Sequence, residues 1–180
     1  HNAERIGSSK AVWSITHGNP VHDTVREISR ITGVDFSIDV TINKNREITS
    51  VFAGDLFEAH NAACESSKRI VMRPVEHEYD IVVTTNSGYP LDQNLYQTVK
   101  GLSAAAQVVK NGGTIICASE CRDGLPNHGE YSKILSESKS MAKLLEAINQ
   151  SGNTRHDQWQ VQVQGKIQMR AAVFIKSDYL

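Results

Sequence analysis

The sequence has 180 residues, of which 39% are hydrophobic and 22% charged, and its formal net charge is −1 at pH 7. This length and composition fit one well-buried globular domain, and the near-zero net charge gives no basic field to favour nucleic acid or anionic lipid. No apolar run reaches membrane-spanning length and no segment resembles a signal peptide, so we expect one domain over residues 1–180 with neither a nucleic-acid nor a membrane partner.

The first part of the chain predicts a helix followed by a hairpin. Residues 1–15 lack a strong period and are expected to form a leading segment. Val21–Thr32 has apolar residues at helical spacing and a stop at Gly33, which predicts a helix with one face in the core. Val34–Ile42 alternates in strict period two, and Glu47–Phe52 follows after a short turn. We expect a hairpin that adds an antiparallel component to the sheet.

The middle of the chain predicts alternating helices and strands. Asp55 is expected to cap a helix that runs to about Lys68, and Arg69–Val75 to form a strand. Tyr79–Val83 is short, β-branched and uninterrupted, as in a parallel strand buried on both faces. A helix should start near Leu91 and end at Asn111–Gly113, and a second buried parallel strand should span Gly113–Ser119.

The last part predicts a loop, two helices and a strand. Glu120–Gly129 contains two glycines and a proline and is expected to be a loop. Glu130–Asn149 has a helical pattern with a possible break near Ser136–Ser140, Asp157 should cap a helix to about Met169, and Ala171–Ile175 should be the final strand. The whole pattern predicts an α/β fold, a Rossmann-like three-layer sandwich with a mostly parallel sheet and an antiparallel hairpin.

Three polar residues share one face of the helix that follows the central strand. Gln93, Gln97 and Lys100 fall at positions i, i+4 and i+7, with Tyr96 beside them. This face lies near the carboxyl end of a parallel strand, where open α/β sheets bind ligands, and the loop Glu120–Gly129 would flank the same cleft. A solvated helix face gives the same pattern and remains the alternative.

The three cysteines, Cys64, Cys117 and Cys121, are odd in number and lie in or beside predicted regular elements. This usage favours reduced thiols and a cytoplasmic location over a disulfide framework. Cys117 and Cys121 straddle a predicted strand end, so they make a poor zinc site without further ligands.

Five separated stretches carry a resemblance to a known family. They are NPVH (Asn19–His22), FAGDLFEAH (Phe52–His60), GYPLDQNLYQTVKG (Gly88–Gly101), GGTII (Gly112–Ile116) and DQWQ (Asp157–Gln160). In this order they resemble the second half of the nickel-dependent lactate racemase family, whose members racemise or epimerise 2-hydroxy acids. The resemblance implies the C-terminal domain of a two-domain isomerase, with a small 2-hydroxy acid as substrate and a missing N-terminal domain as partner.

The family's chemistry avoids a strongly disfavoured dianion by removing the hydrogen beside the substrate carboxylate as hydride. The resemblance implies that a nickel-pincer nucleotide, pyridinium-3,5-bisthiocarboxylic acid mononucleotide carrying Ni, accepts it in the full-length enzyme. The lysine that holds this cofactor, its phosphate site and the bases belong to the family's first half. We therefore expect this fragment to lack the cofactor and to be inactive alone.

The resemblance also implies roles for single residues. It places Tyr96, Gln97 and Lys100 at the substrate and cofactor pocket, with Lys100 and Gln97 as catalytic residues, Trp159 near the substrate and His1 as a nickel ligand. The alternatives are a surface amine for Lys100, core rings for Tyr96 and Trp159, and a tag remnant for His1.

Other residues are expected to support the fold. His22 and His60 lie in predicted helices and are expected to be structural or solvated, and Asp92 is expected to support the turn before the helix. Ser87 and the loop Leu125–His128 depart from the glycines common in the family, which leaves the identity of the 2-hydroxy acid open.

Two other classes of protein remain as alternatives. One is a stand-alone module that binds a small anion without catalysis. The other, a Rossmann-like oxidoreductase that uses free dinucleotide, is disfavoured because the sequence has no GxGxxG after a strand; it also lacks a P-loop and HExxH.

Overall fold

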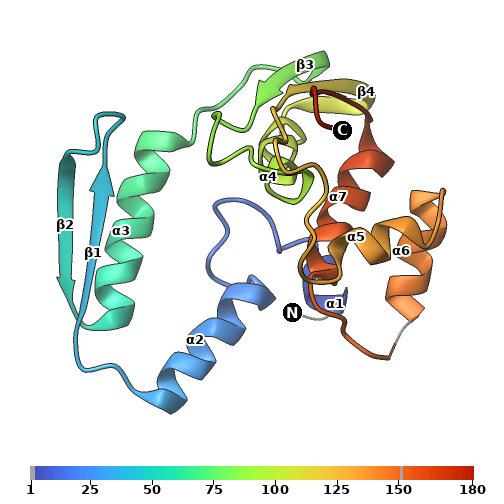
Figure 1. The fold of residues 1–180 in the computed structure, drawn as a ribbon. Helices are drawn as coiled ribbons and strands as arrows, with labels where there is room; N and C mark the ends of the chain where they lie inside the picture. Colours follow the sequence, from blue (N-terminus) through green and yellow to red (C-terminus); the bar gives the residue numbers. More distant parts are fainter. Residues whose placement is uncertain (1–2, 151) are drawn as a thin grey trace. The chain divides into compact units, whose positions relative to one another are not determined.

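A computed structural model describes residues 3–150 and 152–180. By contacts the chain divides into two compact units, one formed by His1–Gly7 with Val75–Leu180 and the other by Ser8–Pro74. We call them the sheet unit and the hairpin unit (Figure 1). No helix among the described residues is both long and apolar enough to cross a membrane.

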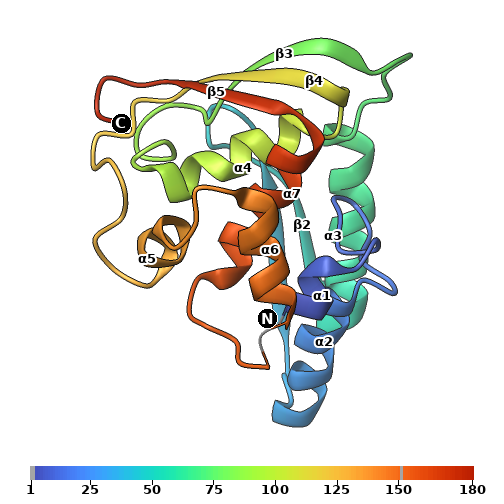
Figure 2. The same ribbon diagram turned by 90° about the vertical axis from the view of Figure 1, so that its right-hand side faces the viewer.

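The sheet unit is built on three parallel strands in the order β3-β4-β5. They are β3 (Tyr79–Thr85), β4 (Val109–Ala118) and β5 (Ala172–Lys176). Helix α4 (Leu95–Ala105) connects β3 to β4, and α7 (Gln158–Arg170) precedes β5. Both helices lie against the same face of the sheet (Figure 2). The predicted α/β class with a parallel sheet is confirmed, because β-branched runs and helical periods alternate along this part of the chain.

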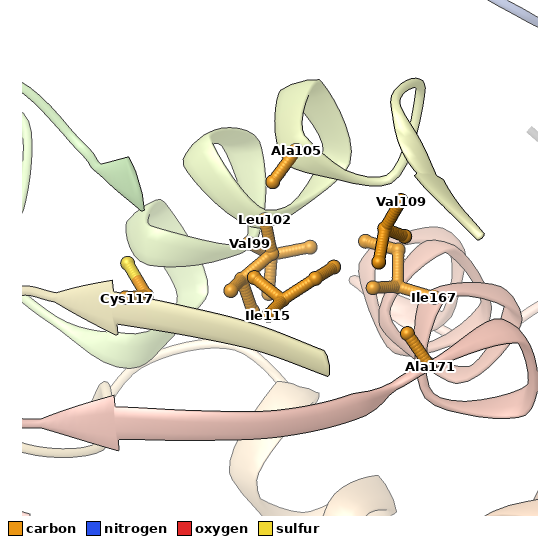
Figure 3. Close-up of a cluster of buried hydrophobic side chains, with 8 residues drawn as sticks. All are labelled: Val99, Leu102, Ala105, Val109, Ile115, Cys117, Ile167 and Ala171. Atoms are coloured by element: carbon orange, nitrogen blue, oxygen red, sulfur yellow. The ribbon is translucent and has the colours of Figure 1, made fainter. Parts of the chain in front are cut away.

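One face of this sheet holds the main hydrophobic core. The buried side chains in it come from α4, β4, α7 and the residue that follows α7. They are Val99, Leu102, Ala105, Val109, Ile115, Cys117, Ile167 and Ala171 (Figure 3). On the opposite face Ile81, Val83, Ile116 and Phe174 are exposed. In the described part of this unit, helices therefore cover one face of the sheet, and the strands are not buried on both faces as their sequence predicts.

A second core joins the remaining helices of the sheet unit. The predicted break is confirmed, because α5 (Tyr131–Ser136) ends before α6 (Met141–Gln150) begins. The buried members of this core are Leu95, Tyr131, Ile134, Leu144, Ile148 and Val161. The leading segment contains a short helix, α1 (Ala3–Gly7), which the sequence does not predict and which packs on α7.

One predicted helix end and one predicted strand are wrong. The sequence places the end of the helix after β3 at Asn111–Gly113, but these residues lie within β4, where Gly112 takes a φ of 78° and the pairing with β3 shifts register. The glycines therefore form an irregularity in a strand and do not stop a helix. The predicted strand Arg69–Val75 is also wrong, since its first residues complete helix α3 (Leu56–Val71).

The hairpin unit contains α2 (Pro20–Thr32), the antiparallel strands β1 (Ser37–Ile42) and β2 (Ile48–Gly54), and α3. The predicted hairpin is confirmed, although its strands form a separate two-stranded sheet and do not join the parallel one. Asn19 and Asp55 cap α2 and α3 through their side chains. Helix α3 packs on both strands.

Two histidines meet between the helices of the hairpin unit. His22 Nε2 lies 3.4 Å from His60 Nε2 and the two rings are stacked. His60 Nδ1 lies 3.5 Å from Asp39 Oδ2 on β1. Burial, followed by the charges of His60 and Arg26, lowers the pKa of His22 below its usual 6.5. His22 is therefore neutral at pH 7, and its protonation opposes this arrangement.

We expect this pair to make the protein less stable in mild acid. Because the folded-state pKa of His22 is lower than the unfolded value, the unfolded chain binds more protons as the pH falls below 6.5. The contribution to the free energy of unfolding is complete above pH 6.5 and is lost as the pH falls through the folded-state pKa. Denaturant titrations at pH 7.5 and pH 5.5 should show this, and His22→Gln should reduce the difference. An unchanged difference in the variant would contradict it.

Candidate functional site

The site begins at the turn between β3 and α4. Ser87 and Gly88 both have positive φ, and the polypeptide then passes through Pro90 before the helix starts at Leu95. Asn94 is the cap of this helix, and its side-chain oxygen accepts the backbone N–H of Gln97 at 3.1 Å. The helix therefore starts one turn later than predicted. Asn94 followed three residues later by Gln97 resembles a capping box, a signal by which the start could have been found.

A buried asparagine fixes α4 against the end of β3. Asn86 is 9% exposed, and its side-chain nitrogen donates to the carbonyl of Gln97 at 2.9 Å and to the carbonyl of Leu91. Gly101 also lies against the end of β3, since a Cβ there would lie 2.6 Å from the carbonyl oxygen of Thr85. The helix can lie this close to the strand only because residue 101 has no side chain.

Hydrogen bonds join the loop before α4 to the loop after β4. Asp92 is buried; its Oδ2 accepts the N–H of Glu120 and its carbonyl accepts the N–H of Cys121, both at 3.0 Å. Gln93 donates to Asp123 Oδ2 at 2.5 Å. Asp92 is expected to support the turn before the helix, and its side chain instead bonds the loop after β4. The two loops are bridged where an open cleft is predicted, and Gln93 is wrongly placed on the helix stripe, since it belongs to this bridge.

Gln97 and Lys100 lie side by side on α4, as their spacing predicts. Lys100 Nζ donates to Gln97 Oε1 at 2.7 Å, with Lys100 exposed and Gln97 half-buried. Among the ion pairs that the structure describes, none involves Lys100. An ammonium group held by an amide and not neutralised by a carboxylate can bind an anion from solution.

Tyr96 and Trp159 lie edge to face with ring centroids 6.0 Å apart, so the structure brings these two predicted site residues together. Tyr96 also packs edge to face on the buried Tyr131, at 5.3 Å. Gln160 Nε2 donates to the carbonyl of Tyr96 at 2.6 Å, which ties the start of α7 to the start of α4. Burial, followed by the charge of Asp157, raises the pKa of Tyr96 above its usual 10, so this phenol is neutral at pH 7.

Asp157 precedes α7 but does not cap it as predicted. Its φ is 62°, its side chain makes no capping hydrogen bond, and its Oδ2 accepts the N–H of Glu130 at 3.3 Å. Gly129 has a φ of 68°, and a Cβ there would lie 1.8 Å from the same oxygen, so another residue would strain the backbone and displace the Asp157 side chain. The carboxylate thus joins the start of α5 to the start of α7, whose first turn contains Trp159.

The candidate metal ligand His1 lies outside the described residues. Within the described residues, no group of three or more His, Cys, Asp or Glu side chains could hold a metal ion. Cys64, Cys117 and Cys121 are free thiols, as predicted. The structure thus brings Tyr96 together with Trp159 and Gln97 together with Lys100. We call these four residues the candidate set, and their joint role is a prediction.

A family model described as the lactate racemase C-terminal domain matches residues 75–180. These residues make up most of the sheet unit and include all four side chains of this set. The chain belongs to the lactate racemase family. The recognition made from five short motifs is confirmed.

Two curated relatives are similar to this racemase-family chain over 99% of its length. The lactate racemase of Lactiplantibacillus plantarum is 36% identical and that of Thermoanaerobacterium thermosaccharolyticum is 34% identical. The solved structure of the lactate racemase apoprotein from the latter organism matches 99% of this chain, with a TM-score of 0.92 and 33% identity. The chain spans 42% of the length of the two curated relatives and 43% of the solved chain.

Proposed function

We propose that this chain is part of a 2-hydroxy-acid racemase or epimerase, an isomerase resembling lactate racemase, and that it contributes substrate-orienting residues to an interdomain active site. The observation that carries the proposal is the exposed Lys100 ammonium, held by Gln97 and unpaired with any described carboxylate. A preceding N-terminal domain is the proposed partner that completes the site.

Each side chain of the set has a distinct role in this proposal. Lys100 binds the substrate carboxylate or the carbonyl oxygen that develops as the 2-oxo acid forms, and Gln97 donates or accepts a hydrogen bond beside it. Tyr96 and Trp159 form an aromatic wall that fixes the orientation of a small substrate and excludes water from one side. Holding the substrate in one orientation removes an entropic part of the barrier to hydride transfer.

The described residues of this chain do not fit the nickel-pincer nucleotide as a binding site. They include no group of three or more metal-ligating side chains, and the resemblance assigns the phosphate site and the attachment lysine to the family's first half. In the proposal this cofactor supplies reversible hydride acceptance in the full-length enzyme. In this proposal the described residues orient the substrate, and His1, which lies outside them, stays the predicted nickel ligand.

The proposal is tested with the full-length gene product supplied with the nickel-pincer nucleotide. D-lactate and a panel of other 2-hydroxy acids are incubated with it, and the products are separated by chiral chromatography. We expect one member of the panel to be converted to its stereoisomer, with no conversion when the cofactor is withheld. Binding of a 2-hydroxy acid with no conversion by the loaded protein would favour the small-anion-binding module instead.

A further inference from the structure

The strands of the hairpin unit expose their apolar side. On β1 and β2 the side chains of Ile38, Val40, Ile42, Ile48 and Val51 are between 48% and 64% exposed. We call these five residues the outer hairpin face. Val40 pairs with Val51 and Ile42 with Ile48 across the two strands, so the face is a continuous array of β-branched side chains.

The polar side of the same strands faces the helix of the unit. On this side Ser37, Asp39, Thr41 and Ser50 are half-buried together with one apolar side chain, Phe52, and α3 packs on both strands. The alternating pattern of β1 therefore places its polar residues toward the unit's own helix and its apolar residues on the outer side. Since apolar side chains normally line the interior, the outer hairpin face marks a second, uncovered layer.

The hairpin unit has almost no core of its own. Among its described residues, Ala59 is the only hydrophobic residue that is fully buried. The apolar stripe of α2 is exposed as well, at Val25, Ile28 and Ile31. A two-stranded sheet with two helices and no buried cluster is at best marginally stable, so it needs an apolar neighbour.

We propose that the outer hairpin face is covered by residues of the full-length polypeptide that lie outside these 180, so that this unit completes its core with them. This inference rests on the proposed function only in placing the chain within a longer racemase-like protein. The fold recurs over 99% of this chain within a solved racemase chain of which it accounts for 43%, so such a chain supplies a large additional surface. The face carries no charged side chain, which fits an apolar protein surface.

A second copy of the chain is a less suitable occupant. Association between copies requires a sufficient protein concentration, whereas a contact with another part of the same polypeptide does not. The same face on an unfolded segment could bind another copy only at high concentration. The test therefore separates the two occupants by concentration.

The experiment measures how fast a bulky thiol reagent labels a cysteine placed on the face. Val40→Cys is introduced in a Cys64→Ser background, because Cys64 is half-buried while Cys117 and Cys121 are fully buried. The matched control is Lys44→Cys in the exposed turn between the strands. Labelling is followed in the 180-residue chain and in the full-length gene product, each at low and high protein concentration.

We expect Val40→Cys to be labelled at least about a hundredfold more slowly in the full-length protein than in the 180-residue chain, at every concentration. Lys44→Cys should be labelled equally fast in both. Equal rates for Val40→Cys in the two proteins would overturn the inference. Protection that appears in the 180-residue chain and grows with its concentration would identify a second copy and overturn it as well. Because no step requires turnover, failure of the proposed activity and failure of this inference are distinguishable.

Discussion

Replacing Lys100 with alanine is expected to lower kcat/KM of the full-length protein for its 2-hydroxy acid roughly tenfold to a hundredfold. A charge-assisted hydrogen bond contributes about 1.5–3 kcal/mol, which corresponds to this range of rates. Lys100 is the cation that the structure leaves unpaired beside Gln97, 2.7 Å away, so its loss removes the proposed anion-binding group and leaves an amide alone. Chiral chromatography under initial-rate conditions gives kcat and KM separately.

The separate effects on kcat and KM show whether Lys100 binds the substrate in its ground state or in the transition state. If it holds only the substrate carboxylate, KM rises and kcat is unchanged; if it also stabilises the developing carbonyl oxygen, kcat falls. The matched control is Lys143→Ala on α6, an exposed lysine outside the candidate site, which should leave both constants unchanged. A Lys100→Ala protein as active as the Lys143→Ala protein would refute the assigned role.

Strong periodicity let the sequence predict most of the fold. Helix α2, the hairpin, strands β3 and β5, and the break between α5 and α6 follow from spacing over whole segments, where many residues agree. The same spacing does not predict which face of each segment is buried. The alternation in β1 correctly indicates a strand with two unlike faces, but only the packing of α3 shows that the polar face lies inward. Which face is covered depends on neighbours that a local pattern does not contain.

The ends of helices and strands are predicted less well, because the same turn-forming residues occur at helix ends, in loops and at strand irregularities. Asn111–Gly113 is typical of a helix end but lies at an irregularity inside β4, and the capping role of Asn94 competes with an apolar pattern that extends back to Leu91. Gln93 fits the helical stripe by spacing alone, yet it is outside the helix and bonded to Asp123. One misplaced boundary was enough to assign a side chain to the wrong set.

The sequence identifies the four described candidate side chains, but it does not identify the contacts that hold them in place. Spacing on one helix predicts that Gln97 and Lys100 are neighbours, and the family resemblance adds Tyr96 and Trp159. The contacts that hold them are between segments far apart in the chain, such as Gln160 with the carbonyl of Tyr96. No local signal marks such a pair, because it depends on two helices meeting. The functional roles of the four residues remain predictions.

A change one residue beyond Lys100 is expected to test how closely α4 must approach the sheet. In Gly101→Ala the new Cβ would lie 2.6 Å from the carbonyl oxygen of Thr85 and 3.3 Å from the Cα of Asn86. Both contacts are backbone, so neither neighbour can rotate away and the helix must shift. Alanine gains about 1 kcal/mol of helix propensity over glycine, whereas forced overpacking costs about 1–3 kcal/mol. We expect a net loss of stability.

The larger consequence is for the site, because α4 carries Gln97 and Lys100. A helix pushed away from β3 loosens the bond from Asn86 to the Gln97 carbonyl and displaces both side chains together. A misplacement of about 1 Å in a positioning group can cost about a hundredfold in rate, so activity should fall by more than the small loss in stability implies. This holds at temperatures where the variant is still fully folded.

The measurement is kcat/KM and the unfolding midpoint of the full-length Gly101→Ala protein, with Gly152→Ala as control. Gly152 has open space where a Cβ would be, so its substitution should change neither quantity. A Gly101→Ala protein with wild-type activity and stability would mean that α4 tolerates a wider separation from the sheet than its contacts indicate. A loss of stability with full activity would show that the position of α4 is structural alone, and that Gln97 and Lys100 do not have to be held in place.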